Sequence, residues 1–159
     1  MRRESHHSAG IVLYRDDPER SFLLLRSALT RRPVWEFPKG AIEAGETMLQ
    51  AAERELQEEA GLTAADYEVL EGFEDVERYF FTRGRGADQL LIRKQVTYYV
   101  ARWKQGEIVI SSEASRYQWA NRANAERRLR FPEKRRVLGN AIRWLDQRAP
   151  EPALVAPVG

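Results

Sequence analysis

Apolar residues gather in short runs that predict a mixed α/β protein. Five segments have the aliphatic, β-branched and aromatic content of strands, and they lie at residues 8–15, 22–26, 67–81, 89–103 and 116–120. Residues 35–39 add a short extended segment. A turn is predicted at Asp16-Asp17-Pro18, between the first two strands. The glycine-rich, basic residues 82–88 predict the loop of a long hairpin.

One helix is predicted between the short extended segment and the hairpin. Its apolar stripe recurs at helical spacing, at Leu49, Ala52, Leu56 and Ala60. Thr47 can cap the N-terminus, with Gln50 completing a capping box. Gly61 suits the left-handed position that ends a helix. The helix should therefore span about residues 48–60.

The C-terminal third predicts two more helices. Residues 121–130 read as helical, with Asn121 or Asn124 as the cap. Pro132 suits the first turn of a helix that continues to about Gln147. The apolar stripe of this last helix is predicted at Val137, Ala141, Trp144 and Leu145. Residues 149–159 contain three prolines and no periodicity, and we expect a flexible tail there.

The composition indicates one globular domain, expected at residues 1–148. The 159 residues are 43% hydrophobic and 31% charged, with no internal repeat or linker. The absence of cysteine excludes a disulfide, a thiolate zinc site and a cysteine nucleophile, and it fits a reducing, cytoplasmic location. No apolar run is long enough to cross a membrane, and the polar N-terminus does not read as a secretory signal.

The small net charge of +2 is unevenly distributed. Residues 122–148 carry nine Lys or Arg against three Asp or Glu. An exposed helix face explains this excess most simply. Attraction of a polyanionic substrate or of RNA is the alternative.

Three carboxylates share one face of the predicted helix at residues 48–60. Glu55, Glu58 and Glu59 lie at i, i+3 and i+4, and Arg54 can pair with Glu58 or brace a neighbouring carboxylate. Like charges this close repel, and a hard divalent cation would relieve the repulsion. Mg²⁺ is the expected cofactor because it takes oxygen ligands and is completed by substrate phosphates; Mn²⁺ could replace it. A solvated acidic helix face is the ordinary alternative.

The surrounding residues favour the metal site over that alternative. From Gly40 to Leu62 the spacing G-x5-E-x7-R-E-L-x-E-E-x-G-L is complete, with Glu46 at its first carboxylate position. This pattern resembles the signature of the Nudix hydrolases. The resemblance implies their α/β/α sandwich, with a mixed sheet between helices, over residues 8–146.

Fragments outside the signature resemble the asymmetric diadenosine tetraphosphate hydrolases of this family. In chain order they are Ser8–Arg15, Phe22–Leu25, Trp35-x-x-Pro38-Lys39-Gly40, Glu71–Phe73, Lys94–Ala101, Ser112-Glu113 and Tyr117-x-Trp119. Two departures lie where a nucleoside or distal phosphates would be held. The loop at residues 82–89 is longer than in the animal enzymes, and residues 30–34 lack the His that many of them place beside the Trp.

The resemblance implies roles for residues inside and outside the signature. The metal ligands would be Gly40, through its carbonyl, with Glu55, Glu58, Glu59 and Glu113; Arg54, Glu58, Glu59 and Glu113 would form the catalytic set. Glu58 and Glu59 would share the roles of ligand and base. Substrate would be held by Lys39 and Lys94 at phosphates and by Tyr79 and Phe131 at a nucleobase. Ordinary surface or core positions remain the alternative for each substrate-binding residue, and for Gly40 and Glu113.

The expected activity is Mg²⁺-dependent hydrolysis of a diphosphate linkage by attack of water on phosphorus. The preferred substrates are dinucleoside polyphosphates such as diadenosine tetraphosphate. Three alternatives remain, namely an RNA 5′-pyrophosphohydrolase, a nucleoside triphosphate pyrophosphatase and a non-catalytic nucleotide- or RNA-binding module. The sequence does not determine the oligomeric state, the number of metals or the length of the polyphosphate.

Overall fold

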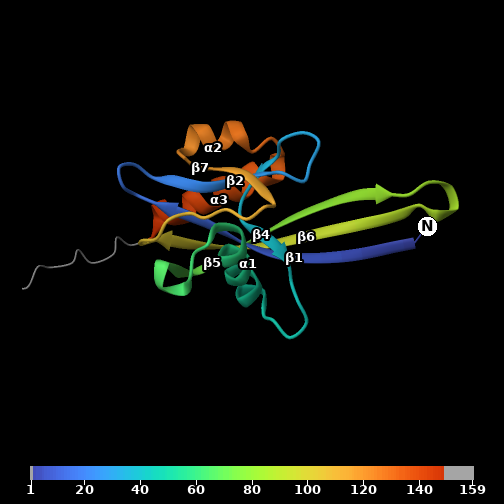
Figure 1. Ribbon diagram of the computed structural model, residues 1–159, viewed down its shortest axis with the longest axis horizontal. Helices are drawn as coiled ribbons and strands as arrows, with labels where there is room; N and C mark the ends of the chain where they lie inside the picture. Colours follow the sequence, from blue (N-terminus) through green and yellow to red (C-terminus); the bar gives the residue numbers. More distant parts are fainter. Residues whose placement is uncertain (1, 149–159) are drawn as a thin grey trace, which may run out of the picture.

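The computed structural model describes residues 2–148, and they form a curled mixed sheet with helices on both faces (Figure 1). The strands are β1 (Arg2–Arg15), β2 (Ser21–Ser27), β3 (Trp35–Glu36), β4 (Lys39–Ala41), β5 (Tyr67–Arg83), β6 (Leu90–Trp103) and β7 (Ala114–Ala120). The helices are α1 (Met48–Ala60), α2 (Arg122–Arg128) and α3 (Pro132–Gln147), with short 3-10 turns at η1 (Ala64–Asp66) and η2 (Gly86–Asp88). The predicted tail at residues 149–159 lies outside the described residues.

The seven-stranded sheet is organised around β1. Its path runs β3-β2-β1-β6-β5, while β4 pairs with β1 and β7 pairs with β2. β1 is parallel to β6 from Arg2 to Tyr14, and β5 and β6 form the predicted antiparallel hairpin. On its other edge β1 meets β4 at residues 8–10 and β2 only at residues 14 and 15. Of the two short strands that hold candidate site residues, β4 therefore lies beside the middle of β1, whereas β3 pairs with β2.

Two apolar cores cover the two faces of the sheet. On one face α1 buries Ala51, Ala52, Leu56 and Ala60 against apolar residues of β1 and β2. On the other face, α2 and α3 cover a core that includes Trp35, Phe37 and Tyr98. This arrangement confirms the predicted α/β/α sandwich with a mixed sheet between helices. No helix within residues 2–148 is long and apolar enough to cross a membrane.

The strand at the N-terminus is longer than the sequence predicts. It begins at Arg2 rather than Ser8 because the polar residues 2–7 pair through their backbone with residues 90–95 of β6. β5 likewise continues to Arg83. The turn that follows contains Gly84 and Gly86 at positive φ angles of 82° and 58°, so glycine there relieves strain that other residues would carry.

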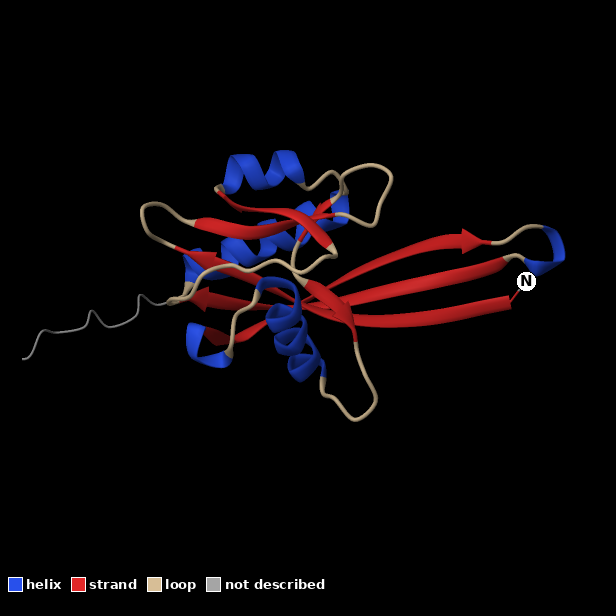
Figure 2. Ribbon diagram, viewed as in Figure 1, coloured by secondary structure: helices blue, strands red, loops and turns tan. Residues whose placement is uncertain are grey.

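These extensions build a projecting feature that we call the arm. It consists of residues 2–7 of β1, residues 78–83 of β5, residues 90–95 of β6 and the connecting residues 84–89. The three strands run side by side away from the helices, toward the end of the molecule that carries the N-terminus (Figures 1 and 2). No described helix covers the arm, so its surfaces are available to solvent along most of their length.

Candidate active site

The acidic helix is formed as the sequence predicts. Thr47 caps α1, because its side-chain oxygen accepts a hydrogen bond from the Gln50 backbone N–H and the Gln50 side chain accepts one from Thr47 N–H. Gly61 ends the helix in the left-handed conformation, with φ of 73°. The caps at Thr47 and Gly61 fix where α1 begins and ends, and therefore which of its side chains face the loop after β4.

Arg54 ties that loop to the helix. Its Nε donates to Glu46 Oε2 at 2.7 Å and its Nη2 donates to Glu46 Oε1 at 3.0 Å. Nη2 also donates to the Ala41 carbonyl oxygen at 2.8 Å. Nη1 donates to Glu55 Oε1 at 3.0 Å and to Glu58 Oε2 at 3.1 Å. Arg54 therefore both pairs with Glu58 and braces Glu55, and it explains the fixed spacing between Glu46 and Arg54.

Gly40 leaves room for a carboxylate. A Cβ atom at position 40 would lie 2.1–2.3 Å from the carboxylate atoms of Glu55, far closer than van der Waals contact allows. Any side chain at this position would displace Glu55. The structure thus gives a steric reason for glycine here, in addition to the possible use of its carbonyl oxygen as a ligand.

Glu59 is the most perturbed carboxylate of the site. It is half-buried, and its Oε2 accepts a hydrogen bond of 2.9 Å from the Lys39 backbone N–H. Burial raises its pKa to about 8, helped by the negative charges of Glu55 and Glu36 and opposed by the Lys39 N–H and ammonium. Burial also raises the pKa of Glu55, against the favourable pairing with Arg54 and with the help of Glu58 and Glu113.

Glu113 reaches the same place from a distant part of the chain. It lies just before β7, and with Glu59 and Glu36 it lines a small hollow between β2, β3 and α1. Glu58, in contrast, is turned outward: 58% of its side chain is exposed, and it points to Arg54. Within residues 2–148, no three acidic or histidine side chains are already close enough to form a metal-binding group. The donors therefore converge without forming a complete ligand set.

The donor chemistry fits a divalent cation. The converging groups are carboxylate oxygens, which hard cations prefer. Burial raises the pKa values of Glu55 and Glu59, and repulsion from neighbouring carboxylates raises them further. A bound cation would reverse that repulsion.

Two lysines lie between this acidic face and the neighbouring pocket. Burial lowers the pKa of Lys39, but the negative groups around it, Glu36 first, outweigh burial, so that the net shift is upward. Burial lowers the pKa of Lys94, and the positive charge of nearby Lys39 lowers it further. Both lysines therefore lie within the electrostatic influence of Glu36, which borders the pocket. Their role in binding phosphates stays a prediction.

Tyr79 and Phe131, which the sequence paired as a clamp, line the same cavity. The cavity has a volume of about 520 Å³ and is formed by β3, β5 and the start of α3. Its lining residues are Val34, Glu36, Glu77, Tyr79, Phe80, Phe131, Pro132, Glu133 and Lys134. Tyr79 is half-buried and stacks on Phe81, with ring centroids 6.4 Å apart, while Phe131 is 48% exposed. Phe131 is therefore a pocket residue rather than a core residue.

Three charged residues of the pocket were missed by the sequence interpretation. Lys134 Nζ donates to both oxygens of Glu77 at 3.1 Å, both side chains are buried, and Tyr98 also donates to Glu77. Lys134 lies one turn before Val137, at a core position of the last helix, and a lysine there was the available signal. Glu36 borders both the pocket and the hollow beside Glu59, and it interrupts an apolar run between Trp35 and Phe37.

The basic C-terminal segment is partly neutralised by ion pairs, of which Lys134–Glu77 is buried. Arg136 bonds to Asp75 and Glu133, and Arg122 pairs with Glu126 at 2.9 Å. With Lys134 committed to Glu77, this segment presents fewer free cations than its sequence indicates. A larger, open hollow of about 640 Å³ beside Arg136 and Asp75 has a charged lining and no aromatic wall.

Comparisons with known proteins show the family to which the chain is related. Residues 4–144 match the model of the NUDIX domain. The asymmetrical bis(5′-nucleosyl)-tetraphosphatase of Sus scrofa is 30% identical over 147 residues, covering 87% of this chain and 94% of that protein. An RNA pyrophosphohydrolase of Legionella pneumophila is 29% identical over 148 residues, covering 87% of this chain and 82% of that protein.

The fold comparison gives the same result. The crystal structure of a Caenorhabditis elegans Ap4A hydrolase binary complex superimposes with a TM-score of 0.76 at 26% identity, covering 89% of this chain and 98% of that chain. The curled mixed sheet, the helical layers and the signature helix together define a hydrolase of pyrophosphate bonds. The chain belongs to the Nudix family.

Proposed function

We propose that the protein hydrolyses dinucleoside polyphosphates, such as diadenosine tetraphosphate, by attack of water on a phosphorus atom. One observation carries this proposal: an aromatic pocket wide enough for a nucleobase opens beside the acidic face, and Glu36 borders both. The name of the Sus scrofa relative, with 30% identity over 147 residues, supports the same substrate class.

The pocket residues would bind one nucleoside and its phosphates. A base would stack on Tyr79, with Phe131 on the opposite wall, and stacking on aromatic faces is worth about 1–3 kcal/mol per base. Lys39 and Lys94 would neutralise phosphate oxygens that enter from the pocket toward α1. Arg54 would keep the loop after Gly40 in register with the carboxylates, which preserves their positions for the reaction.

The acidic residues would hold the cofactor. Glu55, Glu59 and Glu113, with the Gly40 carbonyl and with Glu58 once released from Arg54, offer the oxygen ligands that Mg²⁺ or Mn²⁺ takes. Such a cation supplies charge neutralisation at the phosphate and lowers the pKa of a bound water. Glu58 and Glu59 would share the roles of ligand and proton acceptor, with Glu59 held in place by the Lys39 N–H.

RNA 5′-pyrophosphohydrolysis is the second candidate. The Legionella pneumophila relative carries that name, and the arm described above, which contains Arg78 and Arg93, shares Phe80 with the lining of the same pocket. The basic C-terminal helix, which first suggested RNA, supports it less because several of its cations are paired.

A substrate panel tests the proposal. Diadenosine tetraphosphate, ATP and 5′-triphosphorylated RNA are each incubated with Mg²⁺ in ¹⁸O-water, and the products are separated by chromatography and analysed for the labelled phosphorus. We expect diadenosine tetraphosphate to give ATP and AMP with the highest kcat/KM. Faster release of pyrophosphate from RNA would transfer the assignment to the second candidate.

Matched variants test the residues. Glu58→Gln and Glu59→Gln should each lower kcat at least about 100-fold, because each removes a charge at the reacting phosphate. Glu107→Gln, an exposed glutamate outside the site, should retain wild-type kcat. Wild-type turnover by both site variants would contradict the proposed acidic centre.

A further inference from the structure

The arm has one face without negative charge. Backbone pairing places Arg3 opposite Leu91, Phe80 opposite Arg93, and Arg78 opposite Gln95, so these side chains point to the same side of the three strands. The face contains three arginines, one phenylalanine and five neutral residues (Ser, His, Thr, Leu and Gln by type). The two acidic residues of the arm, Glu4 and Asp88, do not belong to this face, so the face carries only positive and neutral side chains.

The arm also separates charge on the whole molecule. Residues 2–7 and 78–95 contain seven Lys or Arg and two Asp or Glu, a net charge of +5, whereas the complete chain has a net charge of +2. The rest of the chain is therefore negative. A positive, projecting arm on a negative body would steer a polyanion to the arm first.

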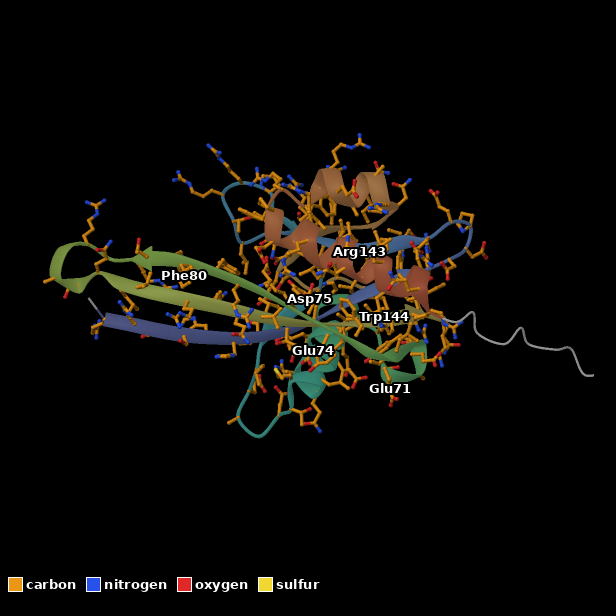
Figure 3. The ribbon with its side chains drawn as sticks, turned by 180° about the vertical axis from the view of Figure 1, so that it is seen from behind. Glu71, Glu74, Asp75, Phe80, Arg143 and Trp144 are labelled. Atoms are coloured by element: carbon orange, nitrogen blue, oxygen red, sulfur yellow. The ribbon has the colours of Figure 1, made fainter. Side chains whose placement is uncertain are left out.

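Phe80 is the exposed aromatic residue of this face. Its side chain is 62% exposed, and Figure 3 shows it on the arm, away from α3 and the residues labelled around it. The guanidinium carbon of Arg93 lies 5.6 Å from the ring centroid, which is cation–π distance. An aromatic ring flanked by guanidinium groups matches the way proteins hold single-stranded nucleic acids, with bases on the ring and phosphates on the cations.

The arm surface meets the catalytic pocket at the free edge of β5, where the neighbours Tyr79 and Phe80 point to opposite faces of the sheet. A groove of about 190 Å³ runs over the arm between Ser5, Arg78, Arg93 and Lys94, and Phe80 forms part of its wall. Phe80 also lines the 520 Å³ pocket that contains Tyr79 and Phe131. A chain whose first nucleotide occupies the pocket would therefore cross the edge of β5 at Phe80 and continue over Arg78 and Arg93 on the other face of the sheet.

We infer that the arm is a binding surface for single-stranded RNA, which enters the active site with its 5′ end. Arg3, Arg78 and Arg93 contact the phosphates behind the 5′-terminal nucleotide, and Phe80 stacks on the next base. The inference adds a macromolecular substrate class to the proposed pyrophosphate hydrolysis and rests on it only for the entry of the 5′ end. RNA binding by the arm stands independently of turnover.

Two other occupants fit the surface less well. A second copy of the chain paired along β1 would bring two arms of net charge +5 together, at an electrostatic cost. A lipid surface would need large apolar side chains at the tip of the arm, and residues 82–89 there contain none.

Fluorescence anisotropy with a 12-nucleotide single-stranded RNA carrying a 5′-triphosphate tests the inference. EDTA is present, so binding is measured without hydrolysis. The arm variant R78E/R93E is compared with R127E/R143E, a control with the same change of charge at two exposed arginines of α2 and α3. In the control, Arg127 and Arg143 bond only to Asn124 and Asn140 among the described residues.

We expect the arm variant to bind RNA at least about 10-fold more weakly, and the slope of log K against log salt to fall by about 1.4, for two lost phosphate contacts. The control should lose less than about threefold. Phe80→Ala should weaken binding about 5-fold or more through lost stacking. Melting temperatures equal to that of the wild type establish that the variants fold. If R78E/R93E does not fold, R78Q/R93Q is used in its place.

Several results would overturn the inference. Equal losses in the arm and control variants would mean that only overall charge matters. Binding to phosphatidylserine vesicles without binding to RNA would identify a membrane surface. A dimer in light scattering that R78E/R93E dissociates, with no RNA binding, would identify a self-association surface. The rate at which R78E/R93E hydrolyses diadenosine tetraphosphate, measured separately, should equal that of the wild type. If neither the wild type nor any variant hydrolyses this substrate, the proposed function is rejected, while the RNA-binding result still stands.

Discussion

Arg54 and Glu46 are joined by two parallel hydrogen bonds, Nε to Oε2 at 2.7 Å and Nη2 to Oε1 at 3.0 Å. The bidentate geometry holds the loop after β4 against α1, although the two residues are eight positions apart. The same guanidinium bonds to Glu55 and Glu58. One side chain thus sets both the shape of the loop and the direction of the carboxylates.

Arg54→Ala should therefore damage activity and stability together. We expect kcat/KM for diadenosine tetraphosphate to fall at least about 100-fold, since the carboxylates lose their orientation. The free energy of unfolding should fall by about 1–3 kcal/mol, because charge-assisted hydrogen bonds are lost. Steady-state kinetics and urea denaturation measure the two effects.

Arg20→Ala is the matched control for Arg54. Arg20 pairs with Asp16 and Asp146 at the other end of the sheet, and 33% of its side chain is exposed. Its loss should lower stability slightly and leave kcat/KM unchanged. If both variants lose stability but neither loses activity, Arg54 is only a structural residue.

Gly40→Ala should disable the site by steric displacement. The new Cβ atom would lie 2.1 Å from the Glu55 carboxylate carbon, so either the carboxylate or the β4 backbone must move. We expect a fall of at least about 10-fold in kcat, as a displacement of about 1 Å in an active site can cost 100-fold. The measurement is kcat at saturating diadenosine tetraphosphate and Mg²⁺.

Gly139→Ala provides the contrast within the same protein. Gly139 lies inside α3, and among the described residues no atom apart from its chain neighbours and the backbone of its own helix is within 4 Å of a Cβ added there. Alanine is a better helix former by about 1 kcal/mol, so this variant should be slightly more stable and fully active. Full activity of Gly40→Ala would show that Glu55 can occupy another position without loss of function.

Magnesium binding should depend on pH through Glu59. Its folded-state pKa, raised by burial to about 8, lies above the ordinary value of 4.5. A raised carboxyl pKa stabilises the metal-free fold below the unfolded-state value, and this contribution disappears as pH rises through about 8. Because Mg²⁺ binds the carboxylate and displaces the proton, the rise of Tm on adding Mg²⁺ should be larger at pH 8.5 than at pH 6.

Thermal unfolding at several pH values, with and without Mg²⁺, measures this coupling between protonation of Glu59 and binding of Mg²⁺. Without metal, Tm should fall between pH 6 and 8.5, and Mg²⁺ should reduce that fall. Glu59→Gln cannot titrate, so it should flatten both trends. A pH dependence that persists unchanged in Glu59→Gln would assign the linkage to another group.

The local parts of the site were predictable from the sequence, whereas the parts built from distant segments were predictable only in outline. Thr47, Gly61 and the glutamates of α1 obey short-range rules of capping and helical spacing, so their arrangement follows from neighbours in the chain. Tyr79 and Phe131 line the same pocket only because β5 and α3 pack together, and their pairing was predicted from resemblance rather than from spacing.

The arm escaped prediction for a different reason. The residues 2–7 of β1 are polar, and alternation of apolar residues cannot reveal a strand that is formed by backbone pairing with β6. The basic character of the loop at residues 82–88 was visible, but its partner strand was not. In the sequence, therefore, only the basic C-terminal segment was considered as a surface that could attract RNA. In the structure, Arg136 and Lys134 of that segment are paired with Asp75 and Glu77.

The Lys134–Glu77 pair gives the last prediction. Both side chains are buried, with 4% and 2% exposure, and the ammonium bonds to both carboxylate oxygens at 3.1 Å. Lys134→Ala leaves Glu77 buried with the Tyr98 hydroxyl as its one hydrogen-bond partner among residues 2–148, which should cost about 3–5 kcal/mol of unfolding free energy. Glu77→Leu combined with Lys134→Met removes both charges and should recover most of that loss.

Urea denaturation of the two single variants and the double variant measures the coupling between Lys134 and Glu77. The exposed pair Arg122–Glu126 is the control, and its removal should change stability by less than about 0.5 kcal/mol. Because the buried pair forms a wall of the aromatic pocket, the double variant should also raise KM for diadenosine tetraphosphate while remaining folded. A stable Lys134→Ala protein with unaltered KM would mean that water replaces the ammonium, so that the pair neither holds α3 to β5 nor shapes the pocket.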